Sequence, residues 1–185
     1  MVFEGWLAGN NDPCLEIGDE FEMVEIARYG QILDGQSATL SGVDFPSADI
    51  DYLGRGGRSC INDNGQVAFK AYFGTDDNQT SAIYLFTPTL HWRYAGSGDW
   101  GEELKWTLGV NPQACHDVLI DPNSNVEISG PSDSATIKSV TIQGDGTHTA
   151  TLRLNASGAT TVLGDVRIKS GGTLYVTNGS LTVKA

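Results

Sequence analysis

Ser139-Val140-Thr141-Ile142-Gln143 is followed, 26 residues later, by the similar segment Asp165-Val166-Arg167-Ile168-Lys169. A second pair of similar segments, residues 151–155 and 173–177, is spaced by 22 residues. Such spacings are typical of one coil of a β-solenoid. One coil alone cannot bury its inward Val, Ile and Leu side chains, whereas stacked coils share a continuous core. The repeat therefore predicts a β-solenoid from about Cys115 to Ala185.

The strands of this region are expected where apolar residues alternate with polar ones between turn residues. Glycine, serine, asparagine and aspartate separate the runs, as they do between short strands. A small β-sandwich would fit the same short strands, and it is the alternative architecture. The expected strands cover residues 117–120, 126–129, 137–143, 150–155, 161–169, 173–177 and 181–184.

The first 90 residues predict a small antiparallel β-domain. Residues 66–73 alternate clearly and follow Asn64-Gly65, which suits a tight turn with positive φ angles. Residues 81–86 return after a second turn, so a β-hairpin is expected over 66–86. Two further strands are expected, at residues 22–29 and 38–45.

Charge also separates the parts of this all-β chain. Residues 1–90 hold 14 carboxylates against 4 Lys and Arg, whereas residues 91–185 hold 9 against 7. We expect an acidic antiparallel β-domain at 1–90, a Trp-rich linker or cap at 91–116, and a solenoid-like strand ladder at 117–185. Because a solenoid has unpaired strands at its ends, capping is the leading role for the Trp-rich segment.

Composition excludes several classes of partner. The net charge of −12 argues against nucleic acid and against binding to anionic membranes. The chain contains no apolar run of the roughly 18 residues that a membrane span needs. Residues 1–13 show no signal-peptide pattern, so we expect either a cytoplasmic protein or a piece of a larger secreted one, and the composition favours the second.

Two stretches resemble segments of known bacterial proteins. Residues 61–69, INDNGQVAF, resemble the N-D-x-G-Q-V-A-F repeats of large uncharacterised surface proteins that are common in planctomycetes. Residues 92–120, with Gly98-Asp99-Trp100, Trp106 and Asp117-Val118-Leu119-Ile120, are similar to the opening of solenoid segments in secreted, autotransporter-like proteins. His116 departs from the acidic residue that is usual there. The resemblance implies an extracellular or cell-surface β-rich protein, and it carries over no catalytic residue.

The aromatic residues of the Trp-rich segment have a second interpretation. Exposed in a row, Trp92, Tyr94, Trp100 and Trp106 would stack on sugar rings and form a carbohydrate-binding surface. Burial in a cap or core is the favoured interpretation of the two.

His116, Asp117 and Asp121 are the candidate catalytic residues, since a histidine beside carboxylates can act as a general base or bind a metal. Adjacent residues of a strand point to opposite faces, which weakens the pairing of His116 with Asp117. If the chain carries out chemistry, we expect it near residues 91–121.

Loop carboxylates in the first half are candidate calcium ligands, because calcium prefers carboxylate and carbonyl oxygens. Ordinary turn chemistry is the favoured interpretation, and it explains Asp63-Asn64-Gly65 on its own. The candidates are Asp49, Asp51, Asp63, Asp76 and Asp77.

The three cysteines leave two redox states open. Cys14, Cys60 and Cys115 allow one disulfide with one free thiol, or three reduced side chains. Spacing alone does not select the pair.

Two functions follow as hypotheses. The first is a non-catalytic extracellular protein with a structural, adhesive or carbohydrate-binding role, whose partners are glycans or other surface proteins. The alternative is a hydrolase for an ester, lactone or glycan that uses calcium or another divalent metal.

Overall fold

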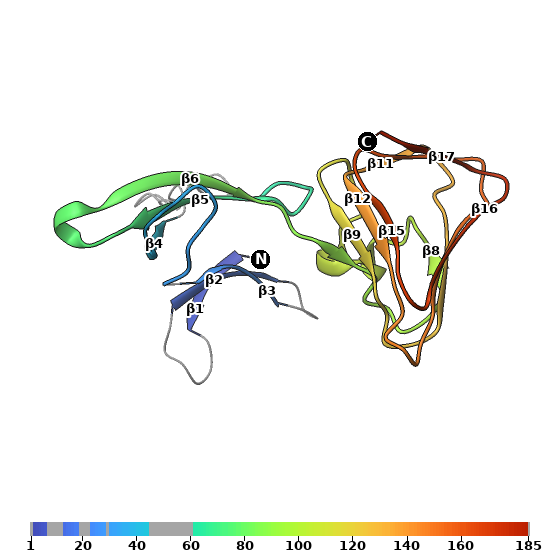
Figure 1. Ribbon diagram of the computed structural model, residues 1–185, viewed down its shortest axis with the longest axis horizontal. Coiled ribbons are helices and arrows are strands. Elements are labelled where there is room, and N and C mark those ends of the chain that lie inside the picture. Colours follow the sequence, from blue (N-terminus) through green and yellow to red (C-terminus); the bar gives the residue numbers. More distant parts are fainter. Residues whose placement is uncertain (1, 7–12, 19–22, 29, 45–60, 185) are drawn as a thin grey trace, which may run out of the picture. The chain divides into compact units, whose positions relative to one another are not determined.

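The computed structural model describes residues 2–6, 13–18, 23–28, 30–44 and 61–184 of the chain. Strands dominate, and the chain divides into two compact units, Met1–Thr87 and Pro88–Ala185 (Figure 1). The Trp-rich segment expected at 91–116 belongs to the second unit. Among the described residues no helix has the length and apolar character needed to cross a membrane.

The first unit contains two three-stranded antiparallel sheets. One is formed by β1 (Val2–Trp6), β2 (Pro13–Gly18) and β3 (Met23–Arg28), and the other by β4 (Leu40–Asp44), β5 (Val67–Phe73) and β6 (Thr80–Phe86). β5 pairs with β6 along its whole length, which confirms the predicted hairpin. Alternate residues of β5 are buried, as the two-residue period of a strand requires. β3 and β4 confirm the strands expected at 22–29 and 38–45.

The second unit is a three-sided β-solenoid, which confirms the predicted fold class. Two short strands are followed by three complete coils whose equivalent strands pair in parallel. A sandwich needs two sheets packed face to face, so that alternative is wrong. The short strands are β7 (Leu90–His91) and β8 (Gly98–Asp99), and the coils are β9 (Asp117–Ile120), β10 (Val126–Ser129), β11 (Ala135–Ile137); β12 (Ser139–Ile142), β13 (Ala150–Leu154), β14 (Ala159–Val162); and β15 (Val166–Ile168), β16 (Gly172–Val176), β17 (Ser180–Val183).

These strands form three walls around a common core. The walls are β7-β9-β12-β15, β8-β10-β13-β16 and β11-β14-β17 (Figure 1). The register matches both predicted repeats, because Ile142 pairs with Ile168 and Leu152 with Leu174. Coils stack closely at the corners: a Cβ at Gly172 would lie 2.2 Å from the Ile142 carbonyl oxygen, so glycine is required there.

Two of the predicted strands are wrong because each one spans a corner. The strand expected at 137–143 is divided at Lys138 into β11 and β12, and the one expected at 161–169 is divided between Val162 and Val166 into β14 and β15. At the first corner the amide of Lys138 donates to the His116 carbonyl 3.0 Å away. A one-residue corner of this kind leaves no run of glycine or proline in the sequence.

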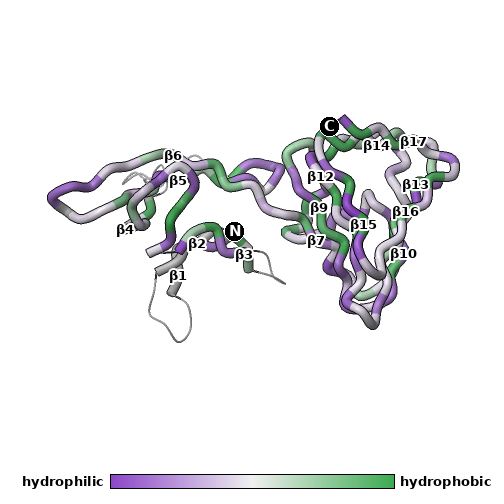
Figure 2. Tube along the Cα trace, viewed as in Figure 1, coloured by the Kyte–Doolittle hydropathy of each residue, from purple (hydrophilic) through white to green (hydrophobic). Residues whose placement is uncertain are grey.

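The solenoid core is built from rows of identical inward positions. Ile120, Ile142 and Ile168 form one row, with exposed fractions of 0%, 0% and 51%. Figure 2 shows hydrophobic and hydrophilic residues alternating along these strands. Each inward side chain is covered by the coils on both sides, so the row is fully buried until the last coil.

The two ends of the solenoid differ. At the N-terminal end, Trp92, Trp100 and Trp106 are buried within the same core as the coil residues. At the C-terminal end, the inward Ile168, Val176 and Val183 stay about half exposed. Three indoles of the Trp-rich segment therefore extend the solenoid core at its N-terminal end.

Candidate functional site

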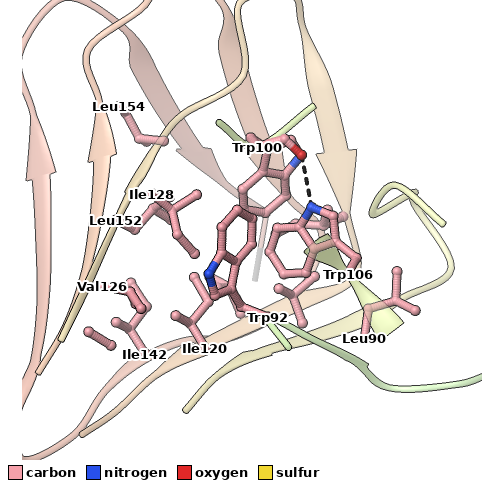
Figure 3. Close-up of a cluster of buried hydrophobic side chains, with 14 of the residues drawn as sticks. Leu90, Trp92, Trp100, Trp106, Ile120, Val126, Ile128, Ile142, Leu152 and Leu154 are labelled. Atoms are coloured by element: carbon pink, nitrogen blue, oxygen red, sulfur yellow. Dashed lines mark hydrogen bonds between the residues drawn. The ribbon is translucent and has the colours of Figure 1, made fainter. Parts of the chain in front are cut away.

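Three indole rings close the N-terminal coil. Trp106 lies in the middle, with its ring centroid 5.0 Å from that of Trp92 and 5.0 Å from that of Trp100, in both cases edge to face (Figure 3). The Trp106 Nε1–H donates to the Trp100 carbonyl oxygen at 2.8 Å, and the Trp92 Nε1–H donates to the Gly96 carbonyl oxygen at 3.0 Å. Both buried N–H groups are thus satisfied, as a stable aromatic core requires.

The four aromatic residues that were predicted to bind sugars differ in their exposure to solvent. The rings of Trp92, Trp100 and Trp106 are buried, and a buried ring has no free face for a sugar. Tyr94 is 50% exposed, but the Lys105 ammonium lies 4.5 Å from its ring centroid and Gly96 packs against its edge. The structure therefore places the three indoles in the core, and the reason is the apolar end of the solenoid that they cover.

The three candidate catalytic residues do not converge. His116 is fully buried, and its Nδ1 accepts a hydrogen bond from the Gln113 backbone N–H at 2.9 Å. Asp117 points outward, as the alternation of a strand predicts. Asp121 lies at the other end of β9, where its Oδ1 is 3.1 Å from the His91 Nδ1. Each of these side chains has a partner that holds a coil or a corner in place.

Asp117 is ionised more easily than an ordinary aspartate. Partial burial raises its pKa, but hydrogen bonds from Lys138 Nζ at 2.6 Å and Ser139 Oγ at 2.5 Å outweigh burial, so the pKa is lowered from 3.8. A general base for neutral pH needs the opposite shift, towards 7. The environment of Asp117 is that of a structural ion pair linking β9 to the next coil.

Asp117→Asn is expected to destabilise the chain at pH 7 by about 0.5 kcal/mol, a small effect because the carboxylate is partly exposed to solvent. The lowered pKa of Asp117 means that its stabilising contribution is present above about pH 3.8 and is lost as the pH falls through the lowered pKa. Urea unfolding of both chains at stepwise lower pH checks this. A difference that stays constant or grows in acid would show that Asp117 is not held as an ion pair.

The candidate calcium ligands are only partly described. Asp49 and Asp51 lie outside the described residues, as does the side chain of Asp76. Asp63 and Asp77 flank opposite ends of β5, roughly 20 Å apart at about 3.3 Å per residue, so they cannot share one ion. Among the described residues no three His, Cys, Asp or Glu side chains gather as a metal-binding group. Thermal unfolding with calcium and with EDTA tests whether the remaining candidates, Asp49, Asp51 and Asp76, bind calcium.

Cys115 is a free thiol of intermediate burial next to His116. Cys60 and the side chain of Cys14 lie outside the described residues. Whether Cys14 and Cys60 form a disulfide or are reduced therefore stays open, as the sequence left it.

A polar groove of about 370 Å³ lies between the Trp-rich segment and the start of β11. No pattern in the sequence indicates this groove, because its two sides are contributed by chain segments about 20 residues apart. Asn111 lies on one side, and its buried Oδ1 has no hydrogen-bond partner. The lining residues are Trp100, Gly101, Asn111, Pro112, Gln113, Ala114, Pro131, Ser132, Asp133, Ser134, Ala135 and Thr136.

Comparisons of the chain with protein-family models, with curated proteins and with solved structures found no match. The groove, the coils and the Trp-rich segment are therefore the features that bear on function.

Proposed function

We propose that the chain is a non-catalytic structural and adhesive module of an extracellular surface protein. The solenoid serves as a rigid scaffold, and binding takes place along its surface and at the groove beside β11. The similarity of residues 61–69 and 92–120 to bacterial surface proteins supports the extracellular setting.

The proposal rests on the bonding partners of His116, Asp117 and Asp121, the three residues that could act as a base or bind a metal. His116 is buried and accepts a hydrogen bond from the Gln113 backbone N–H. Asp117 accepts hydrogen bonds from Lys138 and Ser139, and Asp121 lies within hydrogen-bond distance of His91. A hydrolase needs a base and a nucleophile or bound water that meet in an accessible pocket. These residues lie instead at the start and the end of β9, and each one is bonded to a different group.

Assays of hydrolysis test the proposal directly. We expect the folded chain to cleave 4-nitrophenyl acetate, a γ-lactone and 4-nitrophenyl glycosides no faster than the urea-unfolded chain at equal concentration, with or without calcium. The unfolded chain is the control because exposed histidines react slowly with activated esters. Saturable turnover that disappears in His116→Gln or Asp121→Asn would overturn the proposal.

A further inference from the structure

One wall of the solenoid contains three strands, whereas the other two contain four. Two walls begin with the short strands β7 and β8, whereas the third begins at β11, within residues 88–184, all of which are described. The chain that could have supplied the missing strand turns inward through 3₁₀ turns at Glu103–Lys105 and Thr107–Gly109 to bury Trp106. Pro112, which then lines the groove, has no N–H to donate to a ladder.

The free edge of β11 is directed away from β14. The Leu163 N–H donates to the Ile137 carbonyl oxygen at 2.9 Å, so Ile137 uses its backbone groups on the β14 side. In a parallel ladder, successive residues direct their backbone groups to alternate sides. The N–H and C=O of Thr136 therefore point to the opposite side, and Thr136 lines the groove.

The groove has further features that suit an extended peptide. Its opposite side carries the polar residue Asn111. Asp133 is the charged residue of the lining, and Glu103 Oε1 lies 3.4 Å from the Asn111 Nδ2, so the surroundings are acidic. A neutral or basic strand of about three residues, the length of β11, matches this site.

We propose that the groove binds an extended, neutral to basic peptide segment of a partner protein, which adds to β11 as the missing strand of the third wall. This inference rests on the proposed role as a binding module, and it names the partner chemistry. The bound strand donates to and accepts from the backbone of Thr136 and lies beside Asn111. The inward side chains of the bound strand are small, because the bulky indole of Trp100 lines the groove.

A labelled peptide tests the inference on the full chain. The probe carries the sequence of β14, Ala159–Val162, which is the parallel partner of β11 on its other edge, flanked by one lysine at each end. Fluorescence anisotropy measures its affinity, and hydrogen exchange follows the Thr136 amide. We expect saturable binding and at least tenfold slower exchange at Thr136. A probe flanked by glutamates should bind several-fold more weakly, and a probe with N-methylated backbone amides should not bind.

Three protein variants locate the contact. Thr136→Pro removes the N–H that faces the groove, and we expect about tenfold weaker binding, the usual effect of losing one or two backbone hydrogen bonds. Thr136→Ala keeps that N–H and should bind within about twofold of the original chain. Asn111→Ala should bind several-fold more weakly, because Asn111 lines the groove; it also loses the Nδ2 hydrogen bonds to the Gly101 carbonyl oxygen and to Glu103 Oε1, so its melting temperature is measured beside its affinity.

Equal affinity for Thr136→Pro and Thr136→Ala, or an unprotected Thr136 amide at saturation, would overturn the inference. A neutral hexasaccharide that binds and protects Thr136 where the peptide does not would overturn it too, and would assign the groove to a glycan. Neither result requires hydrolysis, so failure of the peptide site is distinguishable from failure of the non-catalytic role.

Discussion

Ile142→Ala is expected to lower the free energy of unfolding by about 3–5 kcal/mol, whereas Ile168→Ala should cost only about 1 kcal/mol. The two residues are the same type, pair with each other in the register and point into the same core. Ile142 is fully buried between two coils, and Ile168 is 51% exposed in the last coil. Removing the first leaves a cavity that neighbouring coils cannot fill, while the second already contacts solvent.

Urea unfolding followed by tryptophan fluorescence measures both variants, because three of the four tryptophans lie in the solenoid. Ile120, the first residue of the row, is also fully buried, so Ile120→Ala is the matched control and should resemble Ile142→Ala. Equal losses for Ile142→Ala and Ile168→Ala would mean that the last coil is as enclosed as the others, which contradicts the structure.

Trp106→Ala is expected to lower the free energy of unfolding by about 3–5 kcal/mol. Its indole is fully buried between Trp92 and Trp100, so alanine would leave a large cavity at the end of the core. Trp106→Phe keeps most of the ring but leaves the Trp100 carbonyl without its 2.8 Å hydrogen bond. We expect an intermediate loss of about 1–3 kcal/mol for that variant.

Tyr94→Ala is the control at the same end of the solenoid. Tyr94 is half exposed, so its loss should cost under about 1 kcal/mol. Hydrogen exchange adds a spatial readout, since the amides of β9 should lose protection in Trp106→Ala more than those of β15. A Trp106→Ala chain within 1 kcal/mol of the original would show that the indole cluster does not cap the core.

The stacked coils could be predicted because their signal is local and repeated. Inward Val and Ile alternate with outward Thr and Arg in 139–143 and 165–169, and the spacing between these segments equals one coil. The corner at Lys138 was missed although the alternation is interrupted there: Lys138 and Ser139 both separate the inward Ile137 from the inward Val140, and a β-bulge within one strand gives the same interruption. Periodicity identifies which residues face the core but not where the chain changes from one wall to the next.

The candidate site was predicted less well, for a different physical reason. The opposite orientations of His116 and Asp117 followed from strand alternation and are confirmed. The groove beside β11 depends on which wall lacks its first strand, and that is decided by how the chain around Trp106 turns inward. Asn111 and Thr136 are 25 positions apart and carry no shared motif.

The most direct test of the stacked coils is the pattern of methyl–methyl contacts among the isoleucines of one row. In a full chain labelled at its isoleucine methyl groups, nuclear Overhauser effects should connect Ile120 with Ile142 and Ile142 with Ile168. None should connect Ile120 with Ile168 directly, because two coil spacings of about 4.8 Å separate them. Absence of the Ile142–Ile168 contact, or a direct and strong contact between Ile120 and Ile168, would contradict the solenoid.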